Sequence, residues 1–260
     1  MTQHSPNEPP SARVVTPRKH EEIAESLTQD ILVGQYRTGE RLPSERDLAA
    51  RFDANRGAVR EAMKKLEQLG LASIHQGGAR ACAVQDASLD VIGHLLAMGD
   101  VPNEDLVDEI MQVFTALITL AAEATVRRAT DTQIGAIRER LQPLLRGTSN
   151  RTANSIARFE LMRSIMQTSG NLVCQIIARS LFLQFVPRMA PLESLVELDL
   201  AAQRAFAEQL DAALAARNVE GVRSAFESMS NFNREVAKRA FAALKAQGSE
   251  SVSRIWSHVP

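Results

Sequence analysis

The chain is poor in aromatic residues and cysteines, and neither sign of charge is in excess. Only 4% of its 260 residues are aromatic. Alanine, leucine and arginine are plentiful, so the composition favours helices over sheets. Thirty Lys and Arg residues stand against 31 Asp and Glu residues, which gives a net charge of -1. A single copy of so neutral a chain is expected to bind a polyanion weakly, which favours a dimer if the partner is a nucleic acid.

The two cysteines, Cys82 and Cys174, are far apart and match no metal-ligand spacing. We expect two reduced structural thiols, as is usual in the cytosol. The sequence shows no secretory segment and no uninterrupted apolar run long enough to span a bilayer. A cytoplasmic protein with no membrane contact is therefore expected.

Changes in composition divide the chain into five parts. The first part is polar and contains four prolines, which predicts a disordered arm. A small domain, a linker with one short helix, a long helical region and a polar tail follow. The expected bounds of these parts are 1–17, 18–85, 86–102, 103–247 and 248–260.

The small domain begins with two predicted helices. Ile23, Leu27 and Ile31 recur at four-residue steps, which predicts a helix from about residue 18 that Gly34 ends. After the turn at Pro43, Ser44 is a suitable N-cap for a second helix. Asp47, three residues later, is the expected reciprocal partner in a capping box.

A third helix, capped by Asn55, is expected to carry cations on its outer face. Apolar residues pack inward at Val59, Ala62, Met63 and Leu66, and the cations Arg56, Arg60 and Lys64 follow at four-residue steps on the opposite side. From residue 51 to residue 65 there are five basic and two acidic residues. This local excess directs the outer face toward phosphate.

A hairpin is predicted after the third helix. Residues 72–75 and 80–84 read as short strands around the turn Gln76-Gly77-Gly78-Ala79. The order of capped helix, cation-bearing helix and glycine-rich hairpin is that of a winged helix-turn-helix. It predicts a domain that reads double-stranded DNA.

The expected DNA contacts follow from this layout. A recognition helix presents base-reading side chains from its N-terminal half, and Arg56 and Arg60 lie there one turn apart, so either can bond a guanine edge. Arg46 can reach the groove or the backbone from the second helix. The remaining candidates are expected to contact phosphate or to let the hairpin approach a minor groove; they are Ser44, Asn55, Gly57, Lys64 and Gly77.

These segments resemble the GntR family of transcription regulators over about residues 18–85. The resemblance lies in Tyr36 to Ala49, in Arg56 to Ala62 and in Leu66 to Leu71. It implies that the DNA contacts of the family fall on Arg46, Arg56, Arg60 and Gly77. Asn55 departs from the pattern, because the family usually has Ser or Thr there; either type caps a helix.

The second half is helical throughout by its pattern. Helices are expected near 103–129, 131–147, 152–168, 171–189, 193–217 and 219–246, with breaks that include Pro191. The segments at residues 129–131 and 169–171 resemble, more loosely, the helical effector domain of the FadR-type branch. The predicted fold class is thus mostly α, with an N-terminal winged helix-turn-helix and a C-terminal all-α bundle.

Many members of that branch hold a divalent metal with one Asp and three His. By the resemblance these ligands fall on Ile156, Glu160, Ala207 and Met229, and a pocket arginine falls near Phe114. An isoleucine, an alanine and a methionine are poor ligands for such a cation. The sequence therefore predicts no metal and no other cofactor.

The same five positions make an apolar effector pocket the expectation. A lipophilic effector fits it better than a sugar acid, and the resemblance suggests an acyl-CoA as one possibility. Two alternatives remain open: these side chains fill the core and bind nothing, or a metal-dependent organic-acid sensor uses ligands at other positions.

The function expected is that of a dimeric, cytoplasmic transcription regulator, more often a repressor, that reads a short inverted repeat. The chain contains no P-loop, nucleophile elbow, dinucleotide fingerprint or zinc-protease motif, so no enzyme is expected. The main alternative is a helical architectural or scaffold protein that contacts DNA without sequence preference.

Overall fold

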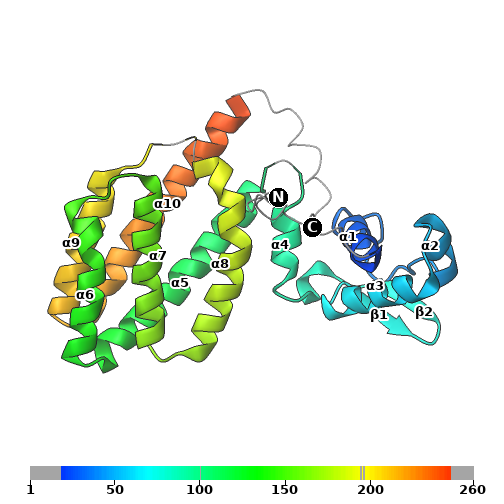
Figure 1. The fold of residues 1–260 in the computed structure, drawn as a ribbon, viewed down its shortest axis with the longest axis horizontal. Helices are drawn as coiled ribbons and strands as arrows, with labels where there is room; N and C mark the ends of the chain where they lie inside the picture. Colours follow the sequence, from blue (N-terminus) through cyan, green and yellow to red (C-terminus); the bar gives the residue numbers. More distant parts are fainter. Residues whose placement is uncertain (1–18, 100, 194, 196, 247–260) are drawn as a thin grey trace, which may run out of the picture. The chain divides into compact units, whose positions relative to one another are not determined.

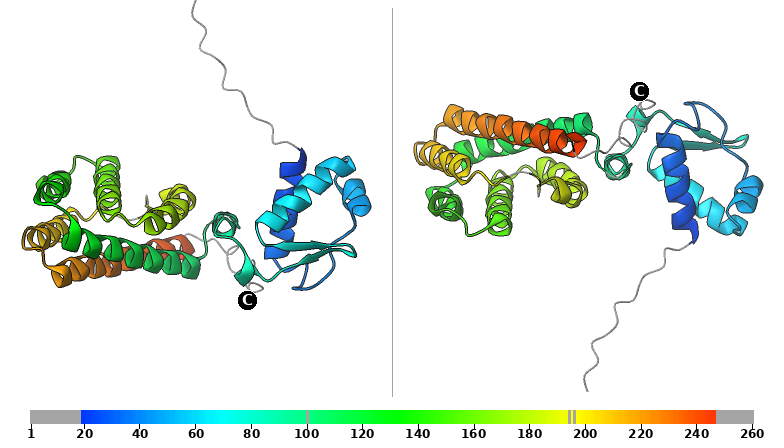
Figure 2. Two further views of the ribbon diagram at one scale, coloured as in Figure 1. Left: turned by 90° about the horizontal axis from the view of Figure 1, so that it is seen from below. Right: turned by 90° about the horizontal axis from the view of Figure 1, so that it is seen from above.

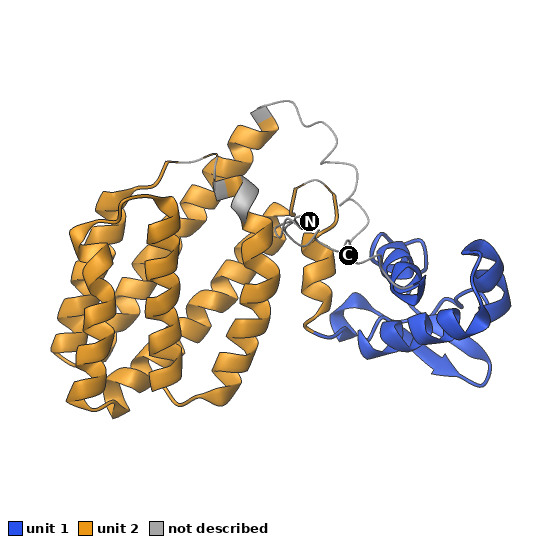
Figure 3. Cartoon of the chain, viewed as in Figure 1, with its two compact units in different colours: residues 1–88 blue, residues 89–260 orange. Residues whose placement is uncertain are grey.

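The computed structural model describes residues 19–99, 101–193, 195 and 197–246. The chain divides into two compact units, residues 1–88 and 89–260 (Figure 3). The expected arm 1–17 and tail 248–260 lie outside the described residues. The expected linker 86–102 is shared between the units, because a short 3-10 helix ends at Asp86 in the first and a further helix begins at Val91 in the second.

The described part of the first unit, residues 19–88, contains the three α-helices and the hairpin that the sequence predicts, followed by a short 3-10 helix. Its elements are α1 (Lys19–Leu32), α2 (Glu45–Arg51), α3 (Arg56–Gln68), β1 (Ala72–His75), β2 (Gly78–Ala81) and η1 (Val84–Asp86) (Figure 1). The helices α1 and α2 both pack against α3. Ile23, Leu27, Leu48, Leu66 and Leu71 have no exposed surface and form the centre of this core.

The hairpin has a tighter turn than the sequence suggested. The strands pair from Ala72 with Ala81 to His75 with Gly78, so only Gln76 and Gly77 form the turn. The second strand thus begins two residues before the expected start at Arg80. Gly78 accommodates this pairing because its φ is +110°, a conformation that side-chain-bearing residues rarely adopt.

A third segment adds to the hairpin. The amide of Leu42 donates to Ala79 O at 2.9 Å, and the amide of Gly39 donates to Ala81 O at 2.8 Å. In return, the amide of Ala81 donates to Glu40 O at 2.9 Å. The chain that leads into α2 is therefore hydrogen-bonded along β2.

The second unit is a bundle of helices (Figure 2). Its elements are α4 (Val91–Leu96), α5 (Glu104–Arg128), α6 (Asp131–Arg146), α7 (Arg151–Thr168), α8 (Leu172–Glu193), α9 (Leu200–Ala215) and α10 (Val219–Ala246). The long helices α5 and α10 run side by side (Figure 1). The fold class predicted from the sequence, a winged helix-turn-helix followed by an all-α bundle, is confirmed.

Two boundaries in the bundle differ from expectation. The helix α8 continues through Pro191 to Glu193, so this proline does not end it. The helix expected from residue 193 begins only at Leu200, because Asp199 caps it: Asp199 Oδ1 accepts the amide of Ala202 at 2.9 Å. A carboxylate at the N-cap stabilises the start of a helix, so the cap at Asp199 places this start better than the helical pattern of the preceding residues does.

Ion pairs join α5 to α10 along their length. Glu123 of α5 is 9% exposed, and its Oε1 accepts from Arg223 of α10 at 2.9 and 2.7 Å, while Oε2 accepts from Arg127 at 3.1 Å. Nearer the other end, Asp108 pairs with Arg234. These contacts lower the pKa of both carboxyl groups, because the guanidinium hydrogen bonds favour the charged form.

Among the residues that the structure describes, two helical segments are long and apolar enough to cross a membrane by length and composition alone: α5 and Leu172–Met189 of α8. The sequence analysis did not predict these two segments, because it considered only uninterrupted apolar runs. Core helices of soluble proteins meet the same criterion, and α5 packs against α7, α8 and α10 within the bundle. Neither helix is by itself a sign of membrane insertion.

Candidate functional site

The first candidate site is the outer face of α3. Its N-terminus is set by Asn55, whose Oδ1 accepts the amide of Ala58 at 2.8 Å. Val59, Ala62, Met63 and Leu66 are buried, as predicted. Arg56, Arg60 and Lys64 are exposed, so the amphipathic pattern has placed the cations where a duplex can reach them.

The helix α2 braces α3 through one ion pair. Glu45, the first residue of α2, accepts from Arg60 Nε at 3.3 Å and from Arg60 Nη2 at 3.2 Å. The pair lies at the surface, with 61% of the Arg60 side chain exposed. The hydrogen bond from Arg60 lowers the pKa of Glu45, and Glu45 raises the pKa of Arg60, so both groups stay charged.

The other predicted contact residues have defined local roles. Ser44 Oγ accepts the amide of Asp47 at 3.3 Å and donates to Asp47 Oδ2 at 2.7 Å. The N-cap is thus confirmed, and the Asp47 carboxylate accepts a hydrogen bond from the Ser44 hydroxyl. Arg46 lies beside Asp47 with 80% of its side chain exposed, and Lys64 pairs with Glu61 at 2.9 Å.

The two glycines among these candidates differ in their surroundings. A Cβ built on Gly57 would lie 3.1 Å from Asn55 Oδ1, so a side chain there crowds the cap of α3. A Cβ on Gly77 meets nothing within 4 Å. The tip of the hairpin is therefore open to an approaching surface.

Three charged residues of the first unit were not assigned a role from the sequence. Glu45 binds Arg60, as described above. Arg80 of β2 is exposed and donates from Nη1 to Gly39 O at 2.7 Å. The guanidinium of Arg41 lies 3.1 to 3.2 Å from where a Cβ on Gly78 would stand. Side chains of a strand alternate between its two faces, and this alternation could have predicted that Arg80 is exposed.

The profile "Bacterial regulatory proteins, gntR family" matches residues 19–81, the segment that carries these features. Residues 19–81 form a helix-turn-helix domain of the GntR family. The match spans α1 to β2, so the braced helix α3 and the hairpin both belong to the GntR domain.

Curated relatives extend the likeness beyond the GntR domain. The chain is 37% identical over 111 residues to the HTH-type transcriptional regulator Mce2R of Mycobacterium tuberculosis (strain CDC 1551 / Oshkosh), which covers 40% of this chain and 45% of the relative. It is 31% identical over 157 residues to the HTH-type transcriptional repressor NanR of Escherichia coli O1:K1 / APEC, which covers 58% of each. The matches thus span about half the length of these relatives.

A solved structure described as "Lar controls the expression of the Listeria monocytogenes agr system and mediates virulence" has a similar fold. It aligns over 86% of this chain and 98% of its own, with a TM-score of 0.53 and 18% sequence identity. At that identity the likeness concerns the fold alone.

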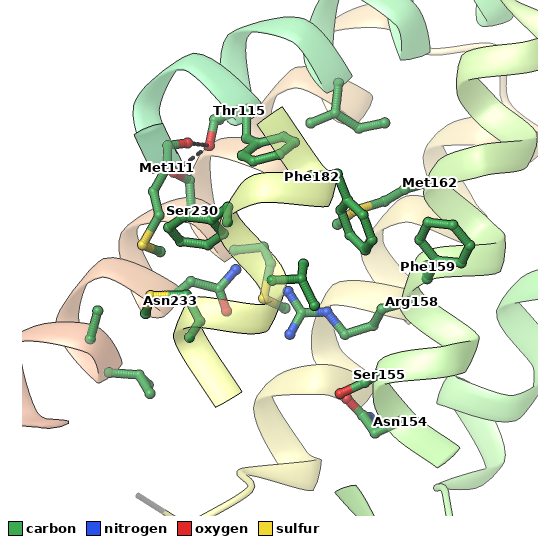
Figure 4. Close-up of a pocket in the computed structure, with 18 of the residues that line it drawn as sticks. Met111, Thr115, Asn154, Ser155, Arg158, Phe159, Met162, Phe182, Ser230 and Asn233 are labelled. Atoms are coloured by element: carbon green, nitrogen blue, oxygen red, sulfur yellow. Dashed lines mark hydrogen bonds between the residues drawn. The ribbon is translucent and has the colours of Figure 1, made fainter. Parts of the chain in front are cut away.

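The second candidate site is a cavity of about 650 Å³ inside the helical unit. Residues of α5, α7, α8, α9 and α10 line it (Figure 4). Phe182 lies at its centre: its ring centroid is 4.8 Å from that of Phe159 and 6.5 Å from that of Phe114. The volume is in the range of sites for small organic molecules, about 300–1,000 Å³.

Only two of the five predicted effector residues line this cavity. Phe114 and Met229 do. Ile156 is 59% exposed, Ala207 is fully buried in the core, and Glu160 binds Arg140 and Arg163 at 3.1 and 2.8 Å. These three positions therefore do not line the cavity.

The reason lies in the rotation of a helix. Consecutive residues turn by about 100°, so an offset of two positions moves a side chain to the opposite face. On α7 the cavity is lined by Asn154, Ser155, Arg158, Phe159 and Met162, among others (Figure 4). The sequence of α7 has no strongly amphipathic pattern, so it did not indicate which face of the helix points toward the cavity.

A metal site needs several ligating side chains close together. Among residues 19–99, 101–193, 195 and 197–246, no three His, Cys, Asp or Glu side chains lie together as ligands. Cys82 and Cys174 are not joined, and burial raises the pKa of the Cys174 thiol. The lining of the cavity contains arginine, amide and hydroxyl groups together with the carboxylates Glu197 and Asp199.

Proposed function

We propose that this chain is a sequence-specific DNA-binding transcription regulator of the cytoplasm, which reads an operator with α3 of each of two copies. The observation that carries the proposal is the exposure of Arg56 and Arg60, one turn apart, on a helix that Asn55 caps and Glu45 braces. Guanidinium groups held in this way can bond guanine edges in the major groove.

Further support comes from charge and symmetry. The net charge of the chain is -1, so the cations of one α3 supply only a small electrostatic attraction to DNA. Two copies double the phosphate contacts, and a two-fold dimer matches an inverted repeat. We therefore propose a homodimer on a palindromic site.

We propose repression as the sign of regulation, with release by a small effector in the helical unit. The relative from Escherichia coli is named a repressor, which favours the same sign here. A cavity lined mostly by apolar side chains favours a lipophilic effector over a sugar acid. The assignment to the FadR-type branch rests on the helical unit that follows the GntR domain.

Footprinting of the full chain on the DNA that flanks its own gene tests this function. We expect a protected palindrome, with the two half-sites about one helical turn apart. A diffuse pattern that shows no preferred sequence contradicts the proposal and favours an architectural protein. Elemental analysis of the same preparation tests the expectation that no metal is bound, and a stoichiometric divalent metal contradicts it.

A further inference from the structure

The cavity gathers a large share of the chain's soft apolar side chains. Six of the nine phenylalanines line it: Phe114, Phe159, Phe182, Phe185, Phe226 and Phe232. Five of the eight methionines do so as well: Met111, Met162, Met166, Met189 and Met229. Aromatic rings supply large apolar contact areas, and methionine adapts to irregular shapes. Such a lining suits a flexible hydrophobic body.

Arginines accompany this lining. Arg158 is half-buried and extends from α7 into the cavity, in the region between Phe182 and Asn233 (Figure 4). Arg151, Arg163 and Arg179 also line it, against the carboxylates Glu197 and Asp199. Asp199 serves as the cap of α9, and Arg163 binds Glu160. The described lining thus contains four arginines and two carboxylates.

One buried polar atom in the lining lacks a partner. Gln203 is 3% exposed, and its Oε1 has no hydrogen bond, although its Nε2 lies 3.8 Å from Met229 Sδ. A buried carbonyl oxygen without a donor costs free energy, and native structures seldom leave one unexplained. A ligand hydroxyl or amide in the cavity would supply that donor.

We propose that the cavity binds an amphipathic carboxylic acid without a metal ion, with the hydrophobic body among the phenylalanines and methionines, the carboxylate at Arg158 and a hydroxyl or amide of the ligand at Gln203. This inference rests on the proposed function, because it names the class of effector for the helical unit. A guanidinium binds a carboxylate through charge-assisted hydrogen bonds, so it replaces the metal that a hard-ligand site would need.

Calorimetric titration of the full chain, without DNA, tests the charge requirement. The probes are dodecanoate, dodecanol and dodecyltrimethylammonium, which share one tail and differ in the head group. We expect dodecanoate to bind more tightly than the other two. The variant Arg158→Gln should weaken dodecanoate about tenfold to a hundredfold and leave dodecanol nearly unchanged. The control Arg140→Gln, on α6 outside the cavity, should alter neither.

Three results overturn this part of the proposal. The first is dodecanol binding as tightly as dodecanoate, which means that the head-group charge is not recognised. The second is an equal loss for both probes in Arg158→Gln, which means that the substitution has disturbed the cavity rather than an ion pair. The third is failure of dodecanoate to bind the unaltered chain.

The variant Gln203→Leu tests the polar contact separately. Because it replaces an unsatisfied buried amide by an apolar side chain of similar size, we expect the thermal stability of the unliganded chain to be kept or raised. Of 3-hydroxydodecanoate and 12-hydroxydodecanoate, at least one should bind the unaltered chain more tightly than dodecanoate, and the variant should lose this preference. Absence of the preference in the unaltered chain contradicts the role of Gln203.

The two proposals fail independently. Titration is made without DNA, and footprinting is made without ligand. A chain that binds dodecanoate through Arg158 but protects no operator supports the cavity proposal and contradicts the regulator. A chain that protects a palindrome but binds none of the probes supports the regulator and contradicts the cavity proposal.

Discussion

Glu45 at the start of α2 holds the guanidinium of Arg60 on α3 through two hydrogen bonds of 3.3 and 3.2 Å. The carboxylate therefore orients a residue that is proposed to read DNA, and it also places a negative charge on the same face. These two effects oppose each other when a duplex approaches, because phosphates repel the carboxylate while the oriented arginine attracts a base edge.

Replacement of Glu45 by Gln should separate these effects. The variant keeps an acceptor for Arg60 and loses the charge, so we expect tighter binding to random duplex and poorer discrimination between operator and random DNA. The slope of log affinity against log salt should become steeper by about one unit. Fluorescence anisotropy at several salt concentrations measures both quantities.

The control for this variant is Glu22→Gln, which removes the charge of an exposed pair on α1. It should leave affinity and discrimination unchanged. If Glu45→Gln bound random duplex no better than the unaltered chain does, the carboxylate would have no electrostatic effect on the bound DNA.

Arg56→Ala should weaken binding at one base position. Loss of a bidentate contact to guanine costs about 1–3 kcal/mol and relaxes the preference at that position. Binding to a panel of operators, each changed at one base pair, measures this effect. Equal loss on every sequence would assign Arg56 to a phosphate instead. Lys65→Ala, an exposed cation in the last turn of α3, provides the comparison and should not change the preference.

The neighbouring glycines of the hairpin offer a matched pair of variants. Gly77→Ala adds a methyl group where nothing lies within 4 Å, so the fold should be kept. If the hairpin tip enters a groove, the same methyl group should weaken DNA binding. Thermal unfolding and anisotropy on one preparation test both statements, and unchanged DNA affinity would remove Gly77 from the interface.

Gly78→Ala should behave differently, because it acts on the fold. Its φ of +110° is unfavourable for alanine, and the new Cβ would stand 3.1 Å from Arg41 Nε. We expect a destabilisation of the first unit of about 1–3 kcal/mol. Faster hydrogen exchange in residues 72–81 measures it, and unaltered exchange would contradict the strain.

The stability of the helical unit should fall in acid partly through Glu123. The hydrogen bond from Arg223 lowers the pKa of this carboxyl below 4.5, so its stabilising effect is complete above that value and is lost as the pH falls through the lowered pKa. The unfolding temperature of the unaltered chain should therefore decrease below about pH 4.5 more steeply than that of Glu123→Gln.

At neutral pH the same variant should lose about 1.5–3 kcal/mol of stability, since it removes charged hydrogen bonds to two arginines. Glu235→Gln breaks only an exposed pair with Lys238 and should change stability by less than about 0.5 kcal/mol. Parallel acid profiles for the unaltered chain and Glu123→Gln would show that Glu123 keeps its ordinary pKa.

The sequence was sufficient for the GntR domain because its signals are local. Ser44 and Asn55 cap the helices that follow them, and the four-residue spacing of Arg56, Arg60 and Lys64 fixes their common face. The bond between Glu45 and Arg60 joins residues 15 positions apart. It depends on how α2 packs against α3, which no local pattern specifies.

The cavity could not be predicted in the same way. Its lining comes from five helices, between Met111 and Ala240. Which face each helix turns toward the cavity depends on packing between residues that are far apart in the sequence. The pattern of α7 is nearly balanced between its faces, with Ile156 exposed and Asn154 buried. The positions taken from the resemblance could therefore not be checked against the pattern of the helix. They did not include Arg158 and Gln203, which line the cavity.

The pairing of residues 39–42 with β2 has a mechanical consequence. The segment that leads into α2 is hydrogen-bonded to β2 of the hairpin, so the tip at Gly77 cannot tilt without pulling on the entrance to α2. A force applied to the hairpin by a bent duplex would be transmitted to Glu45 and from there to Arg60. Deformability of the DNA and the choice of base by α3 should thus vary together rather than separately.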